Sequence, residues 1–129
     1  MKVTASVEWH LKAAANMRGR WPLVKKAKTE RQLGLVLVRQ AELIDKPQGQ
    51  PMAKPPCVVT LTRIAPRRLD DDNLPNAFKS IRDGIADALG ATDDSARAGI
   101  VWRYDQDKGE PNYYGVVMEI EYLPAKDEE

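Results

Sequence analysis

The feature that most constrains the fold is a stripe of apolar residues between positions 74 and 89. At 100° per residue its members fall within about a third of a helix circumference; they are Leu74, Ala77, Phe78, Ile81, Ile85, Ala88 and Leu89. The polar pair at 72–73 offers an N-cap, Pro75 is tolerated in a first turn, and Gly90 is a typical C-terminal stop. The pattern predicts one amphipathic helix that buries a face against another layer. Gly84, in its middle, has no explanation at this level.

Four further segments predict strands. Apolar and polar residues alternate from Val3 to Trp9, and β-rich runs occupy Cys57–Ile64, Ile100–Trp102 and Val116–Tyr122. The polar stretch at 105–112, between the last two runs, predicts a β-hairpin. Such strands would form the sheet against which the helix packs.

A second helix is expected earlier in the chain. The tetrad at 29–32 has the capping-box pattern, and apolar residues recur after it at helical spacing, namely Leu33, Leu37, Ala41 and Ile44. The run at 35–38 fits a short strand equally well. Before the tetrad, residues 12–28 are basic and include the breakers Gly19 and Pro22, which predicts an irregular segment.

These elements predict one α+β domain over residues 1–129, with a four-stranded or similar sheet and two main helices. A chain of this length can bury a core of its own. No apolar run approaches the roughly 20 residues of a membrane-spanning helix, and Glu8 and His10 stand where a signal peptide would be apolar. The single cysteine, Cys57, excludes an internal disulfide and is expected in the core. We therefore expect a cytoplasmic protein with no membrane partner.

Three consecutive aspartates, Asp70, Asp71 and Asp72, stand immediately before the predicted helix. Crowded carboxylates repel one another unless a cation neutralises them. In an extended segment alternate side chains share a side, so Asp70 and Asp72 can offer oxygens to one hard ion such as Mg²⁺, with Mn²⁺ as a substitute. A third ligand would be Asp93 or Asp94, if the chain after the helix returns to its N-terminus. The alternative is an ordinary solvated helix cap.

The charges divide between the two halves of the chain. Residues 1–69 carry 14 Lys and Arg against 4 Asp and Glu, whereas residues 70–129 carry 6 against 15. The division favours an electropositive phosphate-binding surface beside an acidic metal pocket, unless the halves interleave and merely neutralise each other. The candidate phosphate contacts are Arg18, Arg20, Lys25, Lys26, Arg67 and Arg68.

Lys79 lies on the polar face of the predicted helix, close to Asn76 and Asp83. Its ammonium group could reach a phosphate near the metal, or it could pair with Asp83 at i, i+4. His10, the only histidine, is expected to be structural, and its isolation argues against zinc sites that need several histidines.

The D-x-D-N-L element within Arg68–Leu74, the helix that follows, and the aspartate pair after Leu89-Gly90 together resemble the RusA family of Holliday junction resolvases, which are commonly borne by phages or prophages. The matching core spans about 30 residues, from Arg67 to roughly Arg97. The resemblance implies a dimer of mixed α/β subunits that cleaves four-way DNA junctions with magnesium, in recombination and repair.

The family's metal ligands map onto Asp70, Asp72 and Asp94, with Asp93 in support. Founding members carry a functional lysine where this chain has Asn76, and Lys79 on the same face looks like its replacement. The prediction is therefore a magnesium-dependent endodeoxyribonuclease. Three alternatives stay open: a nuclease for other branched DNA such as flaps and forks, a non-catalytic DNA-binding module, and a phosphohydrolase that acts on nucleotides.

Overall fold

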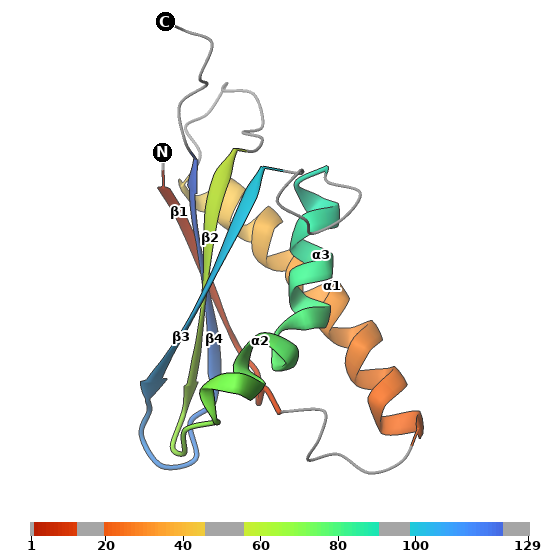
Figure 1. Ribbon diagram of the computed structural model, residues 1–129. Helices are drawn as coiled ribbons and strands as arrows, with labels where there is room; N and C mark the ends of the chain where they lie inside the picture. The colour runs from red at the N-terminus through yellow and green to blue at the C-terminus, as the bar shows by residue number, and fades with distance from the viewer. Residues whose placement is uncertain (1, 13–19, 46–55, 91–98, 123–129) are drawn as a thin grey trace, which may run out of the picture.

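The computed structural model describes residues 2–12, 20–45, 56–90 and 99–122 of the chain. A four-stranded mixed sheet carries the helices on one of its faces (Figure 1). The α+β architecture predicted from the sequence is therefore confirmed. Among the described residues, no helix combines the length and apolarity needed to cross a bilayer.

The sheet has the strand order β1-β4-β2-β3. Its members are β1 (Lys2–Glu8), β2 (Cys57–Ala65), β3 (Ile100–Lys108) and β4 (Gly115–Tyr122). β4 is antiparallel to both β1 and β2, whereas β3 runs parallel to β2 at the edge of the sheet. The predicted hairpin between the last two strands is therefore wrong, because β2 lies between them and residues 105–108 belong to β3.

Alternation along the strands sends one set of side chains toward the helices. In β2 every second residue from Cys57 to Ala65 is buried, and β4 contributes Val116, Met118 and Ile120 to the same core. Arg63 is the exception in this set, a buried guanidinium that donates from Nε to the Leu11 carbonyl at 3.0 Å and from Nη1 to the Arg67 carbonyl at 2.8 Å. The arginine therefore anchors the chain segments that leave β1 and β2.

Helix α1 (Arg20–Asp45) begins nine residues before the predicted capping box. Pro22 lies in its first turn, where a missing N–H costs nothing, so the segment expected to be irregular is helical from Arg20. The tetrad at 29–32 therefore does not begin the helix. Within it, the Glu30 side chain is fully buried and accepts hydrogen bonds from Trp9 Nε1 (2.8 Å) and Lys26 Nζ (2.6 Å). The run at 35–38 is helical, which excludes the alternative strand.

The apolar stripe is confirmed, but its helix is divided. A 3₁₀ turn (Asp71–Asn73) leads into α2 (Leu74–Ala77), and α3 (Lys79–Ala88) follows after Phe78. All the stripe residues are buried except Ala88, which is half-buried. The expected side-chain caps at 72–73 make no capping hydrogen bond, whereas Gly90 has the predicted left-handed conformation, with φ at 80°.

Gly84 now has a structural reason. α1 and α3 cross so closely that a Cβ atom on Gly84 would lie 1.9 Å from the carbonyl oxygen of Arg31. A Cβ atom on Gly34 would likewise lie 2.2 Å from the carbonyl oxygen of Ile81. The two glycines therefore allow direct backbone contact between the helices, and Arg31 closes the same interface through a 2.6 Å ion pair with Asp87.

Candidate metal and phosphate site

The three aspartates lie in an exposed turn that follows β2. Asp70 is extended (φ −60°, ψ 140°), but Asp71 and Asp72 belong to the 3₁₀ turn, and the Asn73 N–H donates to the Asp70 carbonyl at 2.9 Å. The expected extended segment from Asp70 to Asp72 is therefore wrong. Consecutive side chains of a 3₁₀ helix diverge by about 120°, so the turn presents its carboxylates to solvent in different directions.

Gln106 of β3 fixes this turn. Its Oε1 accepts from the Leu69 N–H and its Nε2 donates to the Leu69 carbonyl, both at 2.9 Å. The same Nε2 lies 3.4 Å from Asp71 Oδ1, and the backbone N–H of Gln106 donates to Asp105 Oδ1 at 2.8 Å. No local sequence pattern predicts this contact, because it depends on the parallel pairing that sets Gln106 beside Arg63.

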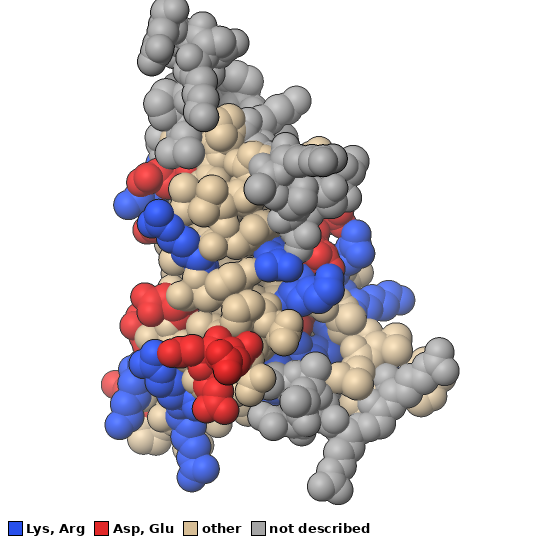
Figure 2. All heavy atoms as spheres, viewed as in Figure 1, with Lys and Arg blue, Asp and Glu red and all other residues tan. Residues whose placement is uncertain are grey.

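A basic hollow of about 320 Å³ adjoins the acidic turn. Its charged lining residues are Arg63, Arg67, Arg68, Asp107 and Lys108. Arg68 reaches across to Asp71, with 3.2 Å between Nη2 and Oδ1. In Figure 2 acidic side chains gather over the turn, with Lys and Arg side chains directly beside them. A phosphate could occupy the hollow while a cation sits at the turn, and such juxtaposition suits phosphodiester chemistry.

The predicted third metal ligand cannot be placed. Asp93 and Asp94 lie outside the described residues. Among the residues that are described, no group of three or more His, Cys, Asp or Glu could hold a metal ion. The nearest described residue after the pair is Gly99, whose carbonyl accepts from the Cys57 N–H at 2.9 Å, where β2 begins. Gln106, at the acidic turn, lies seven residues further along the chain than Gly99, which is about 23 Å in an extended strand. The assignment of Asp94 stays a prediction.

Lys79 forms the i, i+4 pair with Asp83, which was one of the two roles expected for it. The distance from Nζ to Oδ2 is 3.4 Å, and the lysine side chain is mostly exposed. A surface pair of this kind contributes at most a few tenths of a kcal/mol, so Asp83 does not prevent Lys79 from meeting a phosphate. Its role at a phosphate stays a prediction.

The other predicted phosphate contacts differ in their surroundings. Arg67, Arg68 and Lys25 are exposed. Lys26 is 11% exposed, because its ammonium group pairs with Glu30 and lies 3.4 Å from the Ala77 carbonyl. Arg18 lies outside the described residues; Arg20 begins α1, but its side chain is likewise not described.

His10 and Cys57 can be placed as well. The His10 ring stacks on Tyr114 with 3.8 Å between centroids, and its pKa is lowered by burial and by the positive charges of Lys12 and Arg63. Cys57 is buried, as expected, and this burial raises the pKa of its thiol to about 11. The thiol is therefore a core group and not a nucleophile.

Comparison with known proteins adds no identification. No model of a known protein family matches this chain. A search of curated proteins finds no significant match either.

Proposed function

We propose that this protein is a magnesium-dependent, structure-specific endodeoxyribonuclease that resolves four-way DNA junctions as a cytoplasmic homodimer. The observation that carries the proposal is the position of the exposed Asp70–Asp72 turn beside the arginine-lined hollow. The four-way junction and the dimer come from the resemblance to the RusA family.

The carboxylates of the turn have the chemistry that a hard divalent cation prefers, and binding one ion would require the diverging Asp70 and Asp72 side chains to turn toward each other. Asp70 and Asp72 offer exposed carboxylate oxygens, which are the ligands that Mg²⁺ prefers. The third ligand, Asp94 with Asp93 in support, comes from the resemblance to the RusA family. When bound, the ion would polarise the scissile phosphate and lower the pKa of an attacking water. Asp71 is engaged by Arg68 and Gln106, which leaves its two neighbours for the cation.

The protein's own residues would bind and orient the DNA. Arg67 and Arg68 have planar guanidinium groups suited to bidentate contacts with phosphate oxygens. Gln106 would hold the acidic turn in place through Leu69, because both amide hydrogen bonds go to backbone atoms. Lys79, seven residues after Asp72 at the start of α3, would add a positive charge for the phosphate.

The direct test compares Asp70→Asn and Asp72→Asn with the wild-type protein on a labelled four-way junction, in magnesium and in EDTA. Both substitutions remove one negative charge from an exposed position, so we expect the fold to persist and cleavage to fall by at least about a hundred-fold. Glu121→Gln is the matched control, because this exposed strand residue only forms a 3.8 Å pair with Lys2. Wild-type rates in both aspartate variants would refute the assignment.

The choice of substrates separates the alternatives. Equal or faster cutting of flaps or forks would replace the junction with another branched DNA. Tight junction binding without cutting, in magnesium and in manganese, would indicate a non-catalytic DNA-binding module. Cleavage of free nucleotides that a DNA competitor does not inhibit would indicate a phosphohydrolase.

A further inference from the structure

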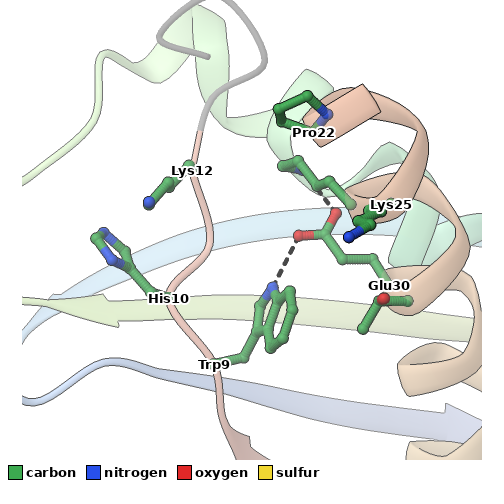
Figure 3. A pocket seen from close by; sticks show the side chains of 8 residues that line it. Trp9, His10, Lys12, Pro22, Lys25 and Glu30 are labelled. Carbon is green, nitrogen blue, oxygen red and sulfur yellow. Dashed lines mark hydrogen bonds and ion pairs between the residues drawn. The ribbon is translucent and has the colours of Figure 1, made fainter. Parts of the chain in front are cut away.

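A second recess lies beyond the arginine-lined hollow and is centred on His10. One hollow, of about 340 Å³, is lined by Trp9, His10, Lys12 and the first turns of α1 (Figure 3). Another, of about 500 Å³, is lined by His10, Tyr114, Arg63 and Arg67. His10 lines both hollows, and we refer to the two together as the His10 groove. Arg63 and Arg67 also line the hollow beside the acidic turn, so the groove leads toward that turn.

The His10 groove carries an excess of positive charge. Figure 3 shows the Trp9 indole pointing at the Glu30 carboxylate, with Lys12 and His10 on the segment that faces α1. Glu30 is already neutralised by Lys26 and hydrogen bonded by Trp9, so it does not offset the charges of Lys12 and Lys25.

The second hollow has the same sign of charge. It is lined by Arg63 and Arg67, with no acidic residue among its described lining residues. Partial desolvation is the largest cause of the lowered pKa of His10, and the positive charges of Lys12 and Arg63 lower it further. The shift favours the neutral form of the imidazole ring.

The centre of the groove is an aromatic platform. His10 and Tyr114 stack with an interplanar angle of 25°, and a third hollow also shares both residues, together with Tyr113. His10 is exposed and Tyr113 is 41% exposed. Proteins bind single-stranded nucleic acids with exposed aromatic rings flanked by cations, because every base has a face that can stack and every phosphate carries a negative charge.

We propose that the His10 groove binds a single-stranded oligonucleotide, with one base stacked on the His10–Tyr114 platform and phosphates held by Lys12, Lys25 and Arg67. A paired base has neighbours on both faces, whereas an unpaired base can leave its stack and meet an aromatic ring. This inference deepens the proposed nuclease function and rests on it for the source of the strand, which would be an unpaired segment at a branch. Binding itself requires no metal.

The test measures fluorescence anisotropy of a short labelled oligo(dT) in EDTA, where no cleavage can occur. His10→Ala should weaken binding at least about five-fold, the usual effect of losing one stacked base, and His10→Phe should restore it. Lys12→Ala should lower the slope of log K against log salt by about 0.7, because one phosphate contact is lost. Lys2→Ala makes the same change in net charge at the other end of β1 and should leave both quantities near their wild-type values.

Three results would overturn the proposal: absence of binding by the wild-type protein, binding by His10→Ala and Lys12→Ala equal to that of Lys2→Ala, or equally tight binding of duplex DNA without dependence on His10. An oligo(U) arm distinguishes RNA from DNA, and equal binding of both supports a groove for either single strand. Failure here is separable from failure of the nuclease proposal. Asp70→Asn should bind oligo(dT) like the wild-type protein even though it does not cut.

Discussion

Substitution of Gly84 tests the close approach of α1 and α3. In an exposed helix, Gly→Ala stabilises a protein by up to about 1 kcal/mol, because alanine loses less backbone entropy on folding. At Gly84 the added Cβ would instead stand 1.9 Å from the Arg31 carbonyl oxygen and 2.8 Å from its carbonyl carbon. Both atoms are backbone, so no side-chain rotation relieves the overlap. We expect Gly84→Ala to destabilise the protein.

The size of the effect follows from the geometry. An ordinary Cβ contact begins near 3.4 Å, so the helices would have to separate by roughly 1.5 Å and loosen the core that they share. Overpacking of this kind costs about 1–3 kcal/mol and occasionally more. If overpacking costs about 3 kcal/mol and alanine gains about 1 kcal/mol in helix propensity, the free energy of unfolding falls by about 2 kcal/mol. For 129 residues the unfolding entropy converts this loss into a decrease in Tm of about 7 °C.

Thermal and urea unfolding, followed by far-UV circular dichroism, measure this loss. Gly34→Ala should behave in the same way, because its Cβ would meet the Ile81 carbonyl oxygen at 2.2 Å. Asn76→Ala is the control, an exposed helical site that should change the free energy of unfolding by no more than about 0.5 kcal/mol. An unchanged or raised Tm in Gly84→Ala would refute the backbone contact between the helices.

Three further substitutions or labels test other parts of the structure. The Cys57 thiol, whose pKa is raised to about 11 by burial, should resist a disulfide reagent in the native protein at mildly alkaline pH and react fully in denaturant. Burial also raises the pKa of Glu30, so its contribution to stability is full below its ordinary value of 4.5 and declines as the pH rises through the folded-state value. Glu30→Gln removes this decline, so the free energy of unfolding of the variant, measured by urea titration, should rise relative to that of the wild-type protein from about pH 4.5 toward neutrality. A difference in unfolding free energy that does not change with pH would contradict the burial of Glu30. Gln106→Ala loses both hydrogen bonds to Leu69 and should lower the free energy of unfolding by about 1–2 kcal/mol, and an unchanged Tm would show that the bonds do not hold the turn.

The sequence predicted those features that depend on local periodicity. The strand at 2–8 follows from alternation and the stripe at 74–89 from helical spacing, whereas the strands at 57–65 and 115–122 follow from runs of β-forming residues. Alternation and helical spacing both show which side of an element faces the core. For this reason they identify the elements without information about what packs against them.

The start of α1 was missed because the local signals there have two readings. Pro22 interrupts a helix interior but begins a helix well, and only the helix boundary decides between these roles. The tetrad at 29–32 resembles a capping box, yet it lies inside α1, where Glu30 accepts a hydrogen bond from Trp9, 21 residues away in the chain. Gly84 likewise acquires its role only from Gly34 and Arg31 on the other helix. The start of α1 and the role of Gly84 thus depend on contacts between distant segments, which periodicity does not show.

The candidate site depends on the one topological feature that the sequence misrepresented. Had β3 and β4 formed a hairpin, β4 would be the neighbour of β3, and the end of β3 would have no reason to lie beside the chain leaving β2. Because β3 instead runs parallel to β2, Gln106 stands opposite Arg63 and reaches the backbone of Leu69, immediately before the acidic turn. The Asp70–Asp72 element could be recognised from its residue types alone. Its anchor on β3, and the basic hollow that β2 and β3 line together, are consequences of strand order.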